Sequence, residues 1–285
     1  MIIKDILVHL DTTPRSDLRL GAAAELASRH GAHLTALHVA ELPSPVMFYG
    51  DPSGFVDARL VDEMMGKMRE NANKDARPVE AGFRERLRRD GIEGEWRMVE
   101  GWAAEVVALH ARYADLTIVG QPDPKDTSFS TARQVPVATL MSSGRPVLVL
   151  PYAGEFPTIG QTVLIGWKSS REAARAVNDA LPLLRNAKKV TVLAINPERG
   201  IGADGGVPAA DIALHLARHG VKAEAAHTVA TDVPDGDVLL NYADDIGADL
   251  IVVGGYGHSR MREFAFGGVT RTLLMTMTVP VFMSH

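Results

Sequence analysis

Four glycines near the end of the sequence have a spacing that could do chemistry. Gly254 and Gly257 follow an apolar run, and Gly267 and Gly268 precede a segment that reads as a helix. Because glycine tolerates positive φ angles and has no side chain, a ligand can approach the main chain of such a loop closely. The amides of the loop and of the following helix N-terminus then point at negative charge. The spacing therefore predicts a phosphate-binding loop, and nucleotide recognition as its chemistry.

The elements that must position this loop occur twice along the chain. The segment 114–120, ADLTIVG, returns at 248–254 as ADLIVVG, which is an offset of 134 positions from Gly120 to Gly254. The same offset carries 145–149 onto 279–283. Because this offset is far longer than the period of a solenoid repeat, each copy is expected to be a domain. The predicted domains are 1–152 and 153–285.

Within each copy, short runs of β-branched residues alternate with helical patterns. Pro14 and Gly31 are placed to open and close a helix in the first copy, and Ser169 with Glu172 forms a capping-box pattern in the second. This alternation is typical of βαβ units in a parallel sheet with helices on both faces. The sequence thus predicts an α/β fold, with two tandem doubly wound parallel-sheet domains. In the first copy the expected strands are 5–10, 33–39, 95–99, 116–119 and 146–150.

The first copy has a long additional segment between its second and third strands. Leu60, Met64 and Met68 recur there at helical spacing, which predicts an ordinary packed helix that Pro78 kinks or breaks. The preceding loop, 43–55, is expected to be a surface excursion, with a lid or a docking surface as the alternatives.

Composition excludes several classes of function. The chain has 285 residues, a net charge of -5 and 46% hydrophobic residues, so we expect a soluble protein that binds neither nucleic acid nor membrane. The absence of cysteine excludes disulfides and thiol nucleophiles and fits a cytoplasmic location. Ten histidines occur without a metal-binding spacing, and no Gly-x4-Gly-Lys-Ser/Thr motif is present, so neither a metal site nor a P-loop is predicted.

The arrangement Gly254-x2-Gly257-x9-Gly267, after a strand headed by Ala248 and Asp249, resembles the universal stress protein family. The resemblance covers the whole chain as two tandem domains. It implies an adenine-nucleotide α-hydrolase-like sheet of strand order 3-2-1-4-5 in each domain, with ligand at the switch between strands 1 and 4. It also implies ATP, possibly with Mg²⁺, on the glycine loop, and an acidic nucleoside contact just after the first strand.

The second copy departs from this family pattern at two positions. Gly268 stands where the nucleotide-binding members have Ser or Thr, and Thr270 could partly replace the missing hydroxyl. Lys168 stands where the first copy has the acidic Asp11, and a lysine cannot accept hydrogen bonds from ribose, although it could pair with phosphate. Trp167 beside it could stack on a base or block the pocket.

The first copy lacks the glycine loop altogether. The offset places Asp123, Arg133 and Gln134 opposite Gly257, Gly267 and Gly268, and Asp123 would repel phosphate. We therefore expect the first domain to act as a stabilising scaffold and the second to hold the nucleotide. The predicted nucleotide contacts are Gly254, Gly257, Gly267, Gly268, Val269, Thr270, Lys168, Ile195 and Val253.

The sequence and the resemblance together favour a cytoplasmic stress-response protein that binds ATP and uses its occupancy to change conformation or protein partners, which the sequence does not identify. No catalytic residue is assigned, and at most slow ATP hydrolysis is expected. The alternatives are a scaffold protein in which both sites are degenerate and, less favoured, an enzyme of the wider α-hydrolase group. The resemblance implies pairing through the last strands, here within one chain, and both a monomer and a homodimer of chains stay open.

Overall fold

The computed structural model of the protein describes residues 2–43, 58–123, 131–197, 209–256 and 268–285. Strands and helices alternate along the first half of the chain, and its central strands consist almost wholly of buried residues. The elements of this half are β1 (Asp5–His9), α1 (Arg15–His30), β2 (His33–Ala40), α2 (Ala58–Asp90), β3 (Gly94–Glu100), α3 (Ala103–Ala111), β4 (Leu116–Gly120), a 3₁₀ turn (Thr131–Gln134), α4 (Val135–Ser142) and β5 (Val147–Leu150).

The second half repeats this alternation with a shorter connection after its second strand. Its elements are β6 (Thr162–Trp167), α5 (Arg171–Leu184), β7 (Lys189–Ile195), α6 (Ala210–Arg218), β8 (Ala223–Thr228), α7 (Asp235–Asp245), β9 (Leu250–Gly254), α8 (Gly268–Thr276) and β10 (Val281–Ser284).

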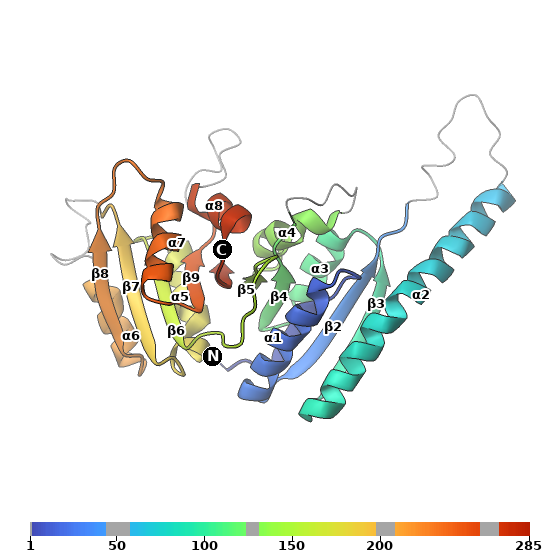
Figure 1. The fold of residues 1–285 in the computed structure, drawn as a ribbon, viewed down its shortest axis with the longest axis horizontal. Coiled ribbons are helices and arrows are strands. Elements are labelled where there is room, and N and C mark those ends of the chain that lie inside the picture. Colours follow the sequence, from blue (N-terminus) through green and yellow to red (C-terminus); the bar gives the residue numbers. More distant parts are fainter. Residues whose placement is uncertain (1, 44–57, 124–130, 198–208, 257–267) are drawn as a thin grey trace.

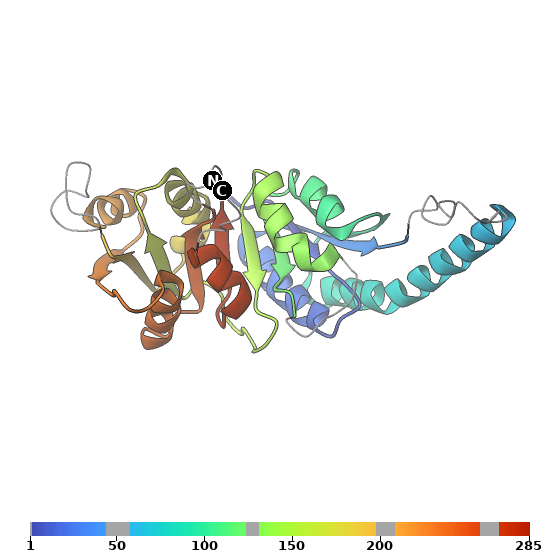
Figure 2. The same ribbon diagram turned by 90° about the horizontal axis from the view of Figure 1, so that it is seen from above.

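Both halves have the same sheet topology. The strand order is β3-β2-β1-β4-β5 in the first half and β8-β7-β6-β9-β10 in the second, and neighbouring strands within each half are parallel. Helices cover both faces of the sheet (Figures 1 and 2). The predicted fold class, two tandem doubly wound domains of order 3-2-1-4-5, is therefore confirmed.

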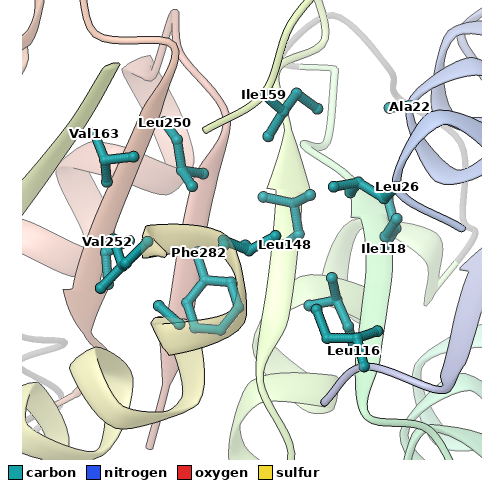
Figure 3. Packing of buried hydrophobic residues seen from close by; sticks show 14 of the residues in the cluster. Ala22, Leu26, Leu116, Ile118, Leu148, Ile159, Val163, Leu250, Val252 and Phe282 are labelled. Atoms are coloured by element: carbon teal, nitrogen blue, oxygen red, sulfur yellow. The ribbon is translucent and has the colours of Figure 1, made fainter. Parts of the chain in front are cut away.

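The two halves join through their last strands. β5 runs antiparallel to β10, with Leu148 opposite Phe282, so the two sheets form one sheet of ten strands. Figure 3 shows Leu148 beside Phe282, with Ile118 on the first-domain side and Val252 on the second-domain side, all of them buried. The pairing of the two copies within one chain, which the sequence predicts, is present.

The connection between β5 and β6 is held by polar contacts to both domains. The carboxylate of Asp249 accepts hydrogen bonds from the main-chain N–H groups of Gly160, Gln161 and Thr162 at 2.9 to 3.1 Å. On the other side, Arg29 donates to the carbonyl oxygen of Ile159 at 2.9 Å. These bonds fix the linker against both domains. The boundary predicted after residue 152 falls inside this connection and stays a prediction.

Three local expectations can be compared with the structure. Gly31 ends α1 in the left-handed conformation, with φ of +57°, as predicted. Pro14 precedes α1 by one residue instead of opening it. Helix α2 does not break at Pro78 but continues to Asp90 and curves (Figure 2). Pro78 is exposed, so water can reach the carbonyl that loses its helical hydrogen bond to the missing proline N–H. The loop 43–55 lies almost wholly outside the described residues.

Across the described ranges, no helix is both long enough and apolar enough to cross a membrane.

Candidate functional site

A cavity of about 500 Å³ opens at the carboxyl ends of the central strands of the second domain. The ends of β6, β7 and β9 and the starts of α5, α7 and α8 surround it, which places it at the switch point of the sheet. Its size is in the range of small-molecule pockets. Gly257 and Gly267 lie outside the described residues. The other seven predicted contacts all line this one cavity, namely Lys168, Ile195, Val253, Gly254, Gly268, Val269 and Thr270.

The wall beneath the cavity is apolar. Leu193, Ile195, Leu239 and Val253 line it together with Trp167, which packs against the main core and still leaves the cavity open. The indole Nε1 of Trp167 is buried and has no hydrogen-bond partner. The apolar wall suits a flat aromatic ligand.

The two described glycines of the loop have different physical roles. A Cβ atom at Gly254 would lie 2.4 Å from the amide nitrogen of Ala173, so packing of β9 against α5 requires glycine there without any ligand. A Cβ atom at Gly268 would meet no atom of the described residues within 4 Å. Gly268 is exposed at the start of α8 and lines the cavity. The first main-chain amides of a helix have no partner within the helix, so they are available to an anion. Of these two glycines, only Gly268 has open space for an anion.

Thr270 holds the first turn of α8 to the end of β9. Its hydroxyl oxygen accepts a hydrogen bond from the amide of Tyr256 at 3.2 Å, and Tyr256 has a left-handed backbone with φ of +51°. The oxygen of Thr270 is therefore engaged inside the protein, so that only the hydroxyl proton could be offered to a phosphate.

The rim of the cavity is fixed by a polar latch. The side-chain amide of Asn196 donates to Asp235 Oδ1 at 2.9 Å and also bonds both main-chain groups of Ala230. This latch ties the end of β7 to the start of α7, where Asp235 lines the cavity.

The start of α5 contributes Glu172 to the cavity wall, whereas the predicted capping box gave this residue a different role. Ser170, and not Ser169, caps α5, because its hydroxyl accepts from the amide of Ala173 at 3.2 Å. The predicted capping box is therefore wrong by one position. Glu172 becomes the second residue of α5, and it is 2% exposed.

The charge of Glu172 follows from its surroundings. Burial would raise the pKa of this carboxyl, but hydrogen bonds from Arg171, from its own main chain and from Ser170, together with the charge of Arg171, lower the pKa below its ordinary value. Glu172 is therefore ionised at neutral pH. The carboxylate oxygen Oε1 accepts from Arg171 Nε at 2.5 Å, whereas Oε2 is buried without a partner.

In the first domain the side chain of Arg19 occupies the space beside Gly120 and Asp11 in the equivalent crevice. Arg19 pairs with Asp11 at 2.6 Å and donates to the carbonyl oxygen of His9 at 3.0 Å and to Ser16 Oγ at 2.9 Å. A Cβ atom at Gly120 would lie 2.5 Å from the guanidinium of Arg19. Asp11, the expected nucleoside contact, is thus engaged in an internal ion pair.

The pKa values of this cluster reflect the ion pair. Burial alone would raise the pKa of Asp11, but Arg19 and hydrogen bonds from Thr13 lower it to about 2. Burial, and after it the charge of Arg19, lower the pKa of His9 from 6.5 to about 4. The cluster therefore holds an ionised aspartate and a neutral histidine at pH 7.

Among the first-domain residues that align with the glycine loop, Gln134 ends the 3₁₀ turn before α4.

The start of the glycine loop touches the first domain. A Cβ atom at Gly255 would lie 2.6 Å from Cδ2 of Leu140, so α4 packs directly against this residue. Near this contact, the side-chain amide of Gln121 donates to the carbonyl oxygen of Leu274 at 3.0 Å. Gly255, at the start of the loop, and α8 therefore both contact the first domain.

The repeated sheet order and the crevice at the switch point define a tandem α/β protein with an open pocket in its second domain. The model of the universal stress protein family matches residues 3–150 and 160–285, and the chain belongs to this family. No curated protein was found to match.

Solved structures share the fold. A universal stress protein from Archaeoglobus fulgidus DSM 4304 is 15% identical with a TM-score of 0.73, and the match covers 98% of this chain and 95% of that one. A functionally unknown protein from Pseudomonas aeruginosa PAO1 is 15% identical with a TM-score of 0.59, and the match covers 99% and 92% of the two chains.

Proposed function

We propose that this protein is a cytoplasmic stress-response regulator that binds an adenine nucleotide, ATP with Mg²⁺, in the second-domain cavity. The observation that carries the proposal is that seven of the residues predicted from the sequence and the resemblance line one cavity at the switch point of the sheet. The cytoplasmic location is supported by membership of the family and by the cysteine-free sequence.

The chemistry of the walls fits the parts of a nucleotide. Trp167 and Ile195 offer apolar surface to a base, and the exposed start of α8 at Gly268 offers main-chain amides to phosphate. Lys168 supplies the positive charge among the described lining residues. Glu172 and Asp235 are negative, so a bound metal that neutralises the phosphates would favour binding.

The contact between the loop and the first domain supports a regulatory role. Occupancy of the cavity would bias the positions of Gly255 and α8, which pack on Leu140 and bond Gln121. A ligand that binds one arrangement of these elements better than another shifts the protein toward that arrangement. Hydrolysis of ATP would be slow, and protein partners would recognise the nucleotide-bound arrangement.

The scaffold alternative is favoured by one pair of observations. Arg19 fills the first-domain crevice, and Gly254 is explained by packing alone. If the second cavity also takes no ligand, the paired domains serve as a docking platform instead.

Calorimetric titration of the purified protein with ATP and Mg²⁺ distinguishes the two. We expect saturable binding at one site per chain, with affinity falling about tenfold in Lys168→Glu, which corresponds to about 1.4 kcal/mol. Lys188→Glu makes the same charge change in an exposed residue just before β7, at the opposite end of the strands, and should bind ATP like the wild type. Absence of saturable binding to the wild type would establish the scaffold alternative.

A further inference from the structure

Glu172 is a buried carboxylate with one oxygen that has no hydrogen-bond partner among the residues that the structure describes. The residue is 2% exposed, lines the second-domain cavity and has no hydrogen-bond partner at Oε2. A buried ionised oxygen without a donor is costly, and such an atom in a native structure needs an explanation. In a cavity wall, the simplest explanation is a donor that arrives with the ligand.

The ion pair with Arg171 does not explain the burial of Glu172. The side chain of Arg171 is 78% exposed and contacts only Oε1 of the carboxylate. Exposed ion pairs contribute little to stability because solvent screens them. Arg171 alone therefore does not offset the cost of burying Glu172. Ser170 and the main chain of Glu172 also favour the ionised form, but Oε2 has no hydrogen-bond partner among the described residues.

The chemistry of the partner follows from the charge of Glu172. An ionised carboxylate only accepts hydrogen bonds, so it repels phosphate and selects hydroxyl or amino donors. Lys168, which lines the same cavity after β6, cannot accept a hydrogen bond. The phosphate-binding amides lie on another element, at the start of α8. Glu172 therefore belongs to the side of the cavity that would take the nucleoside.

We propose that Oε2 of Glu172 accepts a hydrogen bond from a ribose hydroxyl of the bound nucleotide and so selects ribonucleotides over sugars that lack these hydroxyls. This inference rests on the proposed function, because it assigns a specificity residue to the same cavity. Because Oε2 is now enclosed, the bond requires the carboxylate of Glu172 to turn toward the cavity when the nucleotide binds.

The test compares ATP with 2′,3′-dideoxy-ATP in the presence of Mg²⁺ by calorimetric titration. Wild-type protein should bind ATP at least about tenfold more tightly, because a charge-assisted hydrogen bond is lost with the dideoxy sugar. Glu172→Met, which has similar size and only a weakly accepting thioether, should bind the two nucleotides with nearly equal affinity. Glu172→Gln should show a reduced preference, and Glu224→Gln, which removes a carboxylate from the exposed surface of β8, should keep the full preference.

The outcomes separate this inference from the proposed function. If the wild type binds neither nucleotide, the proposed function fails and this inference falls with it. If the wild type binds ATP and dideoxy-ATP equally well, or if Glu172→Met keeps the preference, the nucleotide proposal stands and the role of Glu172 is overturned. The comparison on the wild type needs no variant to fold.

Discussion

Lowering the pH should weaken the first domain through a single buried histidine. His9 ends β1, is 5% exposed, and has its pKa lowered from 6.5 to about 4 by burial and then by the charge of Arg19. Between these two pH values the unfolded chain binds the proton and the folded chain does not. Stability therefore rises with pH across this window and is lost as the pH falls from about 6.5 toward 4.

The magnitude follows from the size of the shift. A lowering of the pKa from 6.5 to about 4 corresponds to about 3 kcal/mol of unfolding free energy, and most of it is already lost at pH 4.5. Replacing His9 with glutamine removes the titrating ring and keeps a neutral polar side chain of similar size.

Urea unfolding at pH 7 and pH 4.5, followed by circular dichroism, measures the effect. Between the two pH values the wild type should lose about 2 to 3 kcal/mol more than His9→Gln. The same loss in both proteins would refute the reasoning, and so would an imidazole NMR signal of His9 that titrates near pH 6.5.

Three further predictions follow from the geometry of the two crevices. Gly254→Ala should lower the unfolding free energy by about 1 to 3 kcal/mol, because its Cβ would lie 2.4 Å from the Ala173 amide nitrogen. Gly268→Ala, with no described atom near its Cβ, should leave the melting temperature unchanged or raise it. Equal losses of stability in calorimetry would contradict this. Gly268→Ser adds a hydroxyl donor at the start of α8 and should tighten ATP binding several-fold in titration, an expectation that unchanged affinity would defeat. Arg19→Met leaves the charge of Asp11 without its partner and should cost about 3 to 5 kcal/mol at pH 7, with part of the loss recovered when Asp11→Asn is added; denaturant unfolding of the single and double variants would show whether it is recovered.

The sheet could be predicted from the sequence because its strands are continuous apolar runs. Runs such as 116–119 and 250–253 indicate strands that are buried on both faces of a sheet. Because these runs recur at one offset, the sequence predicts two domains with the same topology. The residues of the cavity could be predicted for a related reason, since parallel strands bring all their carboxyl ends to one edge.

The role of single residues at that edge could not be predicted in the same way. A glycine required by packing, such as Gly254, has the same sequence signature as one that faces a ligand, and only the distance to Ala173 separates them. Arg19 lies on α1, eight residues after the Asp11 that it neutralises, but a charged helix residue is normally expected to be solvated. Its filling of the first crevice depends on tertiary packing.

Glu172 was assigned to the wrong role because of a shift of one residue. With Ser169 as the cap, Glu172 would be the third helical residue and would reach back to the cap; with Ser170 as the cap, it is the second and lies buried in the cavity wall. Helix boundaries read from sequence are uncertain by about this much, and one position turns a helical side chain by about 100°.

A crystal structure of the protein grown with excess ATP and Mg²⁺ tests the central claim most directly. The account predicts nucleotide density in the second-domain cavity, with the base against Trp167 and Ile195, phosphates at the start of α8, and the Arg19 ion pair unchanged in the first domain. An empty second cavity at saturating ATP, or nucleotide found only in the first domain, would contradict it.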